Sequence, residues 1–384
     1  MEYAELNSIA NIVSGYAIPS SDMTTEGTAI IKITNIREDG TLDLINTARY
    51  NKPITDKLKK FLLRKKDIVV CMTGATIGKV ARILKLDQDY IVNQRVAIIR
   101  AKNQDLQDFV FHLLTLPTFR RYVEIVGYGA AQPNISASAI GKYKFLNSGD
   151  ILQQRRIASI LSAYDNLIEN NTRRIRLLEQ MAENLYKEWF VRFRFPRHEK
   201  TEFENGLPKG WKVERVKEIV KRLPFNRIYK GYELEKMGNV IVIDQSTDEF
   251  LGFHNNEPSH YADYDAPLII FGDHSCKFQL MTRDFSLGEN VIPYTTYNQK
   301  EVNAYWLFYA TRRLIQTEEY KRHWGRFTAM KVLIPDYQLQ QQFEKQVKAF
   351  EKEKNLLSSK NALLSRQRDL LLPRLMSGKL EVKQ

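Results

Sequence analysis

Two long segments of the chain share one spacing of apolar residues, and this spacing constrains the fold more than any other feature. In the first segment, steps of four and three residues join Ile157, Leu161, Tyr164, Ile168, Asn171, Ile175, Leu178, Ala182, Leu185 and Trp189. In the second segment, the same steps join Phe343, Val347, Phe350, Lys354, Leu357, Asn361, Leu364, Arg368, Leu371 and Leu375. Mostly apolar positions at these steps are typical of coiled-coil helices. Every position recurs 186 residues later, which predicts an internal repeat.

Both segments are free of helix-breaking residues. No Gly or Pro occurs within 151–195 or within 337–372, so each segment is expected to form one long helix. An amphipathic helix of this length needs a partner, and its own repeat, packed antiparallel, is the simplest one. Pro196 is expected to close the first helix and Pro373 to end the second.

The second seam is less regular than the first, because Lys354 and Arg368 occupy nominal core positions. A stripe through Leu356, Leu363 and Leu370 is therefore an alternative contact face. An Asn at one seam position of each helix fits a register-setting role, and a position at the solvent edge fits equally well.

Short β-branched runs precede each long helix and are typical of strands. In the first half, strands are expected over 29–33, 67–72, 80–84 and 96–100, with a helix over 108–122. In the second half, strands are expected over 239–243, 267–271 and 278–281, with a helix over 303–321. The predicted fold is mixed α/β: two globular domains separated by two long antiparallel coiled-coil helices, in a pseudo-twofold internal repeat. The predicted boundaries are 1–147, 148–195, 196–335 and 336–384.

The formal net charge of +13 favours a polyanionic partner, because a basic surface attracts nucleic acid or anionic lipid. One short stretch, 49–66, holds many of the basic residues, although a solvated face explains such a run equally well. No run approaches the roughly 18 apolar residues of a membrane span, and the first ten residues carry Glu2 and Glu5 where a signal peptide would be basic. No membrane association and a cytoplasmic location are therefore expected.

Motifs of DNA-modifying enzymes are missing from the sequence. No two of the 12 prolines are adjacent, as an adenine-N6 methyltransferase motif would require, and neither Cys71 nor Cys276 follows a proline, as in cytosine methyltransferases. The segment 74–80 resembles a phosphate loop, but its spacing is one residue short and no hydroxyl follows Lys79. The six histidines lack metal-ligand spacing. The sequence predicts a binding protein that is not an enzyme, with no catalytic residues and no metal.

Several segments, taken in order, resemble the DNA specificity subunit of type I restriction-modification systems. Those similar to the first recognition domain are GTAIIKITNIR at 27–37, KDIVV at 66–70, TGATIGKV at 73–80 and NQRV at 93–96. The helix from QQRRI at 153–157 to WFV at 189–191 is similar to the central conserved region. LPKGW at 207–211, IDQS at 243–246 and IIFGDH at 269–274 resemble the second recognition domain, and RQRDLLLPRLMSG at 366–378 the distal conserved region.

The resemblance implies a subunit that binds double-stranded DNA without catalysing a reaction. Each recognition domain would read one half of a gapped target, and the two helices would fix the spacing between the halves. The resemblance further implies two modification subunits, which carry S-adenosylmethionine, and restriction subunits, which use ATP with magnesium. No cofactor is expected on this chain itself.

Candidate base-reading residues were chosen from polar side chains in expected loops, because Arg reads guanine and Asn or Gln reads adenine. In the first half they are Asn35, Arg37, Thr73, Thr76, Lys79, Gln94, Arg95, Gln132 and Asn134. In the second half they are Gln245, Ser246, His274, Lys277 and Arg326. The alternative for about half of them is that they cap turns or fill polar loops.

Two other classes of function compete with this interpretation. A helical scaffold protein would carry its basic charge incidentally and would bind no specific DNA sequence. A fused methyltransferase would recognise and modify DNA in one chain, and the lack of a Pro-Pro pair argues against it.

Overall fold

The computed structural model describes residues 2–37, 40–128, 133–147, 150–246, 248–317 and 321–382. The chain divides into two compact units: unit 1 contains residues 1–170 and 361–384, and unit 2 contains Asn171–Lys360. Both unit boundaries fall inside the long helices, so the units cut across the four predicted segments. The predicted division into four segments stays a prediction.

Unit 1 contains two four-stranded sheets. The first has the order β2-β9-β6-β7 and is antiparallel, with β2 at Ala10–Ser14, β9 at Val96–Ala101, β6 at Ile68–Cys71 and β7 at Val80–Arg82. The second has the order β3-β5-β4-β8, with β3 at Met23–Thr24, β5 at Ala48–Tyr50, β4 at Thr28–Ile31 and β8 at Tyr90–Val92. In this sheet β4 and β8 run parallel. A separate pair joins β1 (Tyr3–Glu5) to β10 (Lys144–Leu146).

The first sheet is buried on both faces. Ile68 and Val70 of β6 pack in a core with the helices, whereas Val69 and Cys71 pack in a second core shared with β4 and β8. Because successive strand residues point to opposite faces, burial on both faces requires a continuous apolar run. This is why the segment around β6 shows no alternation of apolar and polar residues.

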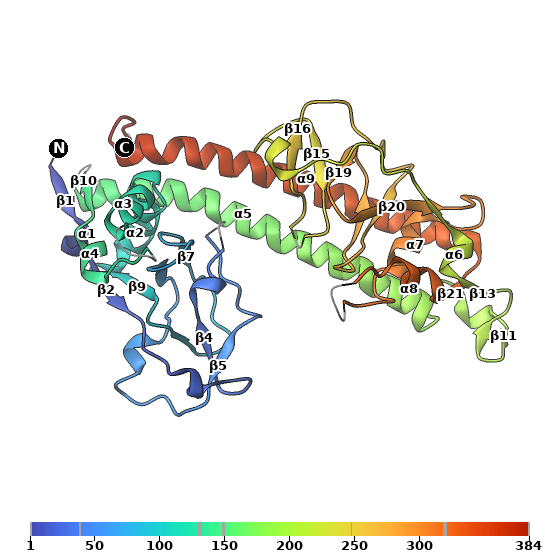
Figure 1. Ribbon diagram of the computed structural model, residues 1–384, viewed down its shortest axis with the longest axis horizontal. Helices are drawn as coiled ribbons and strands as arrows, with labels where there is room; N and C mark the ends of the chain where they lie inside the picture. The colour runs from blue at the N-terminus through green and yellow to red at the C-terminus, as the bar shows by residue number, and fades with distance from the viewer. Residues whose placement is uncertain are drawn as a thin grey trace. The chain divides into compact units, whose positions relative to one another are not determined.

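Helices cover the outer face of this sheet (Figure 1). The short ones are α1 (Leu6–Ile9), α2 (Gln107–Leu114), α3 (Pro117–Gly127) and α4 (Ala137–Gly141). Two long ones, α5 (Ile151–Tyr186) and α9 (Tyr337–Met376), contribute one end each. The start of α5, with Ile157 and Leu161, shares a core with Leu372 and Leu375 at the end of α9.

Unit 2 repeats this arrangement. Its antiparallel sheet has the order β14-β20-β17-β18, with β14 at Val220–Arg222, β20 at Val291–Thr296, β17 at Leu268–Gly272 and β18 at Phe278–Met281. A three-stranded sheet has the order β16-β15-β19, with β16 at Gly252–His254, β15 at Val240–Ile243 and β19 at Phe285–Leu287. Two further pairs join β13 (Lys212–Arg215) to β21 (Lys331–Ile334) and β11 (Phe203–Glu204) to β12 (Leu207–Pro208). The short helices are α6 (Val216–Ile219), α7 (Ala304–Thr311) and α8 (Trp324–Ala329).

Strand pairing confirms the internal repeat and the mixed α/β class. The order β14-β20-β17-β18 matches β2-β9-β6-β7. The parallel pair of β15 with β19 matches that of β4 with β8, and in each unit the middle strand also pairs antiparallel with its other neighbour. One strand with a parallel and an antiparallel neighbour therefore recurs in both units, which supports duplication.

Two predicted helices are wrong in extent. The helix expected over 108–122 is two helices, α2 and α3, because Leu116 takes an extended conformation before Pro117. The helix expected over 303–321 is α7, which ends at Thr311. It begins after Asn303, whose side-chain oxygen accepts hydrogen bonds from the next backbone N–H groups, those of Tyr305 and Trp306.

The predicted ends of the long helices are also wrong. Pro373 lies inside α9, which continues to Met376. One missing N–H in the last turn is tolerated there, because Leu375 and Met376 are buried in the core of unit 1. The regular part of α5 ends at Tyr186 and is followed by a π-helical turn, Lys187–Val191, so the helix stops before Pro196.

The apolar seam residues of both long helices are buried or half-buried. Within unit 1, Arg368 of α9 reaches Asp165 of α5. Within unit 2, Lys354 of α9 reaches Glu179 of α5, and Phe343 lies 6.1 Å from Tyr186 between ring centroids. In each unit, later residues of one helix meet earlier residues of the other, so the segments are antiparallel. The alternative stripe through Leu356, Leu363 and Leu370 is 48%, 60% and 58% exposed and does not carry the contact.

In unit 1, the charged residue at a seam position of α9 is Arg368, and it pairs with a carboxylate of α5. Arg368 Nη1 donates to Asp165 Oδ1 at 2.8 Å, and Arg82 Nη2 of β7 donates to the other oxygen of the same carboxylate at 3.1 Å. Arg82 is 8% exposed and also donates to Asp108 of α2 at 2.8 Å. The guanidinium lies 4.2 Å from the ring centroid of Phe111. We call Arg82, Asp108, Asp165 and Arg368 the Arg82 network.

Unit 2 has a corresponding cluster with different chemistry. Glu351 of α9 is 5% exposed and accepts hydrogen bonds from Tyr309 of α7 at 3.5 Å and from Lys354 at 3.2 Å. Burial lowers the pKa of Lys354, but the carboxylates of Glu351 and Glu179 more than offset this and raise it overall. Lys354, the other charged residue at a seam position of α9, is therefore paired with carboxylates and stays charged.

We predict that His112 of α2 makes the stability of unit 1 depend on pH. Burial lowers the pKa of His112 to about 4, against the opposing charge of Asp165. The unfolded chain takes up this proton near pH 6.5 and the folded chain does not, so stability falls as pH falls through this window. From pH 7 to 5 the loss should be about 2 kcal/mol. It can be measured as the free energy of unfolding in urea.

A His112→Gln variant removes this titration, and its stability should fall less over the same pH range. His198→Gln, a change at a half-buried histidine in unit 2, is the matched control and should behave as the parent chain. Equal pH slopes for the parent and His112→Gln would contradict the prediction.

Candidate nucleic-acid interface

Three loops meet at one end of the first sheet in unit 1, and Met72 is their common point. The Met72 backbone N–H donates to the Arg95 carbonyl at 2.9 Å, and the Met72 carbonyl accepts from Ile135 at 2.9 Å. Gly74 N–H donates to the Pro133 carbonyl at 3.0 Å. These bonds tie the β6–β7 loop, the β8–β9 turn and the segment before α4 together by backbone alone.

The tied loops bring several predicted residues together. Gln94, Arg95 and Asn134 have exposed side chains, and Thr73 forms a β-bridge with Asn134. Thr73, Thr76 and Lys79 are half-buried in the β6–β7 loop. Exposed Arg and Asn side chains on a rigid loop frame can form the paired hydrogen bonds that distinguish guanine and adenine.

The β6–β7 loop is a hairpin between strands. Gly74 and Gly78 both take a φ of +81°, a conformation that residues with a Cβ rarely adopt. A phosphate loop instead passes from a strand to the N-terminus of a helix. The segment 74–80 therefore resembles a phosphate loop in its residue sequence but not in its backbone structure.

Asn35 has a structural role in unit 1. Its side chain is 3% exposed; it accepts from Lys32 N–H at 2.9 Å and donates to the carbonyls of Asp43 and Asn46 at 3.0 and 3.1 Å. Both amide hydrogens and the oxygen are therefore in use. The exposed Arg37 pairs with Asp43 at 3.2 Å. Hydrogen bonds from the Asn46 side chain and backbone are the main reason that the pKa of Asp43 falls to about 2.

Gln132, the remaining candidate of the first half, lies outside the described residues. It falls between Tyr128, whose side chain is 85% exposed, and the tied segment that contains Asn134.

Four predicted residues of unit 2 meet at the β17–β18 turn. His274 N–H donates to the Gln245 side-chain oxygen at 3.2 Å, and Lys277 Nζ donates to the carbonyl of Asp244 at 3.3 Å. Ser246 donates its hydroxyl to the Asp244 carboxylate at 2.6 Å. Lys277 also contacts the Asp248 carbonyl, and burial lowers its pKa. The lysine thus connects the turn to the loop after β15.

Arg326, the fifth candidate, is exposed on α8 and donates to the Gln316 carbonyl at 3.4 Å. Its helix is held to the same turn by Asp273, whose side-chain oxygen accepts from His323 and Trp324 N–H at 3.1 and 2.9 Å. Sequence reasoning did not select Asp273 as a site residue, although it falls in the segment 269–274 that resembles the second recognition domain. It also missed Asn290 and Arg322, which lie beside this turn; the internal repeat was the signal that could have found them.

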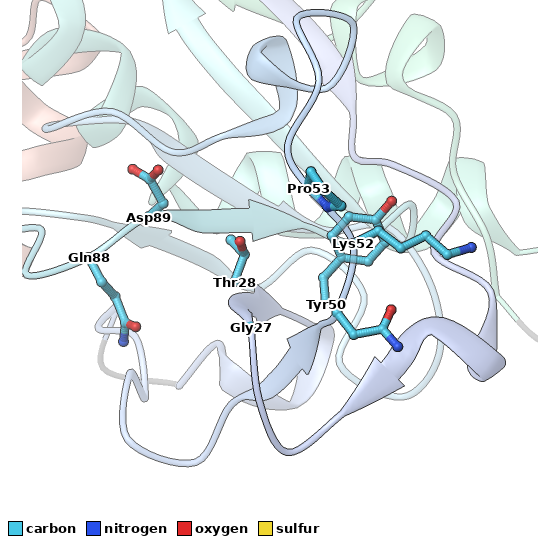
Figure 2. Close-up of a pocket in the computed structure, with 8 residues that line it drawn as sticks. Gly27, Thr28, Tyr50, Lys52, Pro53, Gln88 and Asp89 are labelled. Atoms are coloured by element: carbon cyan, nitrogen blue, oxygen red, sulfur yellow. The ribbon is translucent and has the colours of Figure 1, made fainter.

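A cavity of about 460 Å³ lies elsewhere in unit 1, at the start of β4 and the end of β5 (Figure 2). Its lining residues are Gly27, Thr28, Tyr50, Asn51, Lys52, Pro53, Gln88 and Asp89. Lys52 pairs with Asp22 at 2.9 Å, which raises the pKa of the lysine. None of the predicted base-reading residues lines this cavity, so it is separate from the loops tied at Met72.

The described ranges contain no group of three or more His, Cys, Asp or Glu side chains placed to hold a metal ion. In the same ranges, no helix is both long and apolar enough to cross a membrane. Cys71 is buried and Cys276 is half-buried, and neither of these two described cysteines is part of a disulfide.

Comparison with known proteins finds similarity to a DNA specificity domain and to specificity subunits. Residues 1–180 match the family described as type I restriction modification DNA specificity domain. The chain is 25% identical to the type I restriction enzyme MjaIX specificity subunit of Methanocaldococcus jannaschii, over 97% of this chain and 92% of that protein. It is 31% identical over 118 residues to the type I restriction enzyme HindI specificity subunit of Haemophilus influenzae, covering 29% of this chain and 26% of that protein.

A solved structure shows the same fold. The crystal structure of the type I restriction-modification system S subunit from M. genitalium superposes with a TM-score of 0.56, covering 100% of this chain and 96% of that chain. The two sequences are 15% identical, so this likeness speaks for the fold alone.

We predict that Asn35→Ala destabilises unit 1 by about 1 to 3 kcal/mol, because it leaves a backbone N–H and two carbonyls without their partner. Asn134→Ala is the matched change at an exposed site and should alter stability by no more than about 0.5 kcal/mol. Urea unfolding of both variants measures the difference. Equal losses would contradict the structural role assigned to Asn35.

Proposed function

We propose that this chain is a specificity subunit of a type I restriction-modification system and reads a DNA target in two parts, one with each unit. Binding, not catalysis, is its proposed contribution to the restriction-modification complex. The observation that carries the proposal is the recurrence of one four-stranded sheet order in both units, combined with the specificity-domain match of residues 1–180.

Unlike side chains on like frames support two unlike half-sites. Unit 1 presents the exposed Arg95 and Asn134, whereas the β17–β18 turn of unit 2 carries His274 and Lys277, which are half-buried. Each base pair that is read contributes about 1 to 3 kcal/mol of discrimination, so one unit reading a few pairs discriminates weakly. Two linked units combine their preferences, which gives a long effective target from two short ones.

The long helices are proposed to fix the gap between the half-sites. Each runs without interruption from residues of one unit into residues of the other, α5 over 36 residues and α9 over 40. At about 1.5 Å per residue a helix of this length is a stiff spacer of several tens of ångströms. In this proposal the gap depends on helix length and the recognised bases depend on the loops.

The part of α9 that belongs to unit 1 offers a surface for partner subunits. Leu363 and Leu370 lie seven residues apart along this helix and are exposed. Exposed apolar residues at helical spacing favour docking of another protein. We propose that two modification subunits bind here and supply S-adenosylmethionine, and that restriction subunits bring ATP with magnesium.

A map of N6-methyladenine across the genome tests the proposal. Cells with this gene and its neighbouring modification genes should show a gapped two-part motif, and cells deleted for this gene alone should lose it. The measurement is sequencing that detects N6-methyladenine. Methylation that is independent of the gene, with the modification subunits expressed, would instead favour a helical scaffold without sequence specificity.

Arg95→Ala should relax one half-site and leave the other unchanged, with a loss of about 1 to 3 kcal/mol at one base pair. The measurement is the methylated motif in cells that carry the variant. Weaker methylation of all sequences alike would mark Arg95 as a phosphate contact.

The DNA affinity of the complex should also fall as the salt concentration rises. A plot of log affinity against log salt concentration should have a slope near −4 to −5 if about five phosphates are neutralised.

A further inference from the structure

The two units repeat a set of backbone hydrogen bonds as well as a sheet order. In unit 1 the residue after β6, Met72, donates to Arg95; in unit 2 the residue after β17, Asp273, donates to the Asn290 carbonyl at 2.8 Å. The carbonyl of Met72 accepts from Ile135, and the carbonyl of Asp273 accepts from His323 at 2.8 Å. Asp273 therefore takes the place of Met72.

The hairpin bonds show the same correspondence. Cys71 N–H donates to the carbonyl of Lys79 at 2.9 Å, as Gly272 N–H does to that of Lys277 at 2.8 Å. Gly78 has its counterpart in Cys276, which also takes a positive φ, of 53°. Lys79 and Lys277 are thus equivalent lysines. The frame is the same in both units although the β17–β18 turn is shorter than the β6–β7 loop.

This correspondence assigns places to two residues of unit 2. Asn290 corresponds to Arg95, because the carbonyl of each accepts a hydrogen bond from the backbone N–H of the residue that follows β17 or β6. Arg322 corresponds to Asn134, because each immediately precedes the residue that donates to that same position. Unit 1 has Arg at the first place and Asn at the second, and unit 2 has the two residue types exchanged.

Both residues of unit 2 are accessible. The side chain of Asn290 is exposed, and its φ of 58° is one that Asn adopts more readily than most residues. The side chain of Arg322 is 82% exposed, and its Nε lies 3.9 Å from a carboxylate oxygen of Asp273. At this distance the guanidinium is oriented by the carboxylate while its other N–H groups can reach a ligand.

We propose that Asn290 and Arg322 determine the bases read in the second half-site, from the places that Arg95 and Asn134 occupy in the first. The inference rests on the proposed function and deepens it. Asn presents the donor and acceptor that match adenine, and Arg presents the two donors that match guanine. The exchange makes the two half-sites prefer different bases at corresponding positions.

The test uses the full chain assembled with its modification subunits. The complex methylates a DNA library in which both half-sites are randomised, and the methylated pool is sequenced. Asn290→Gly keeps the positive φ and removes the amide, and Arg322→Ala removes the guanidinium. Each should reduce the preference at a base pair of the second half-site about tenfold or more, with the first half-site unchanged.

Two controls separate this inference from the proposed function. Asn239→Gly changes an exposed Asn of unit 2 just before β15, at the end opposite the loop that holds Gln245, and should leave both half-sites unchanged. Arg95→Ala should relax the first half-site. If it does so while Asn290→Gly and Arg322→Ala leave the second half-site unchanged or weaken all sequences alike, the inference is overturned and the proposed function stands. If the parent complex selects no gapped motif, both fail.

Assembly of each variant with the modification subunits is checked by gel filtration before methylation is measured. Should Asn290→Gly fail to assemble, Asn290→Asp tests the same place, because Asp also tolerates a positive φ and loses the amide donor. Relaxation of the second half-site by this variant supports the inference, and an unchanged preference overturns it.

Discussion

The Arg82 network is the constraint on which unit 1 depends. One buried arginine of β7 joins a carboxylate of α2 to a carboxylate of α5, and that second carboxylate also holds Arg368 of α9. Buried charges are costly unless every partner is present, so the network accepts one register of the sheet against both helix segments. In unit 2, Tyr309 of α7 and Glu351 and Lys354 of α9 form a cluster that connects helices without a strand residue.

Because the Arg82 network fixes the sheet of unit 1 against its helices, the side chains of the loops at the end of the sheet can vary. The bonds that tie the loops at Met72 and Asp273 run between backbone atoms, so they are indifferent to most side-chain changes. Exposed positions such as Arg95 and Asn290 can therefore change residue type while keeping their place. A rigid frame with freely exchangeable side chains suits a protein whose partners differ only in nucleotide sequence.

Periodicity in the sequence predicted the two long helices, their seam and the internal repeat, because a long heptad pattern has few alternatives. It could not predict that Lys354 and Arg368 keep seam positions by pairing with carboxylates of the other helix, since those partners are distant in sequence. Residue type alone selected Arg95 and His274, and the structure places each beside other predicted residues. Residue type could not distinguish the exposed Asn134 from the buried Asn35. Burial of a polar side chain depends on tertiary contacts that no local pattern records.

The order in which the segments of each unit occur along the chain has a consequence for its synthesis. Unit 2 is contiguous and is complete once Lys360 has been made. Unit 1 begins with the first residues but takes Leu372, Leu375 and Met376 into its core. Proteins fold during translation as their domains become available, so the first unit to be started is the last to be finished. Until α9 has been made as far as Met376, the part of the unit 1 core that Leu372, Leu375 and Met376 fill stays uncovered.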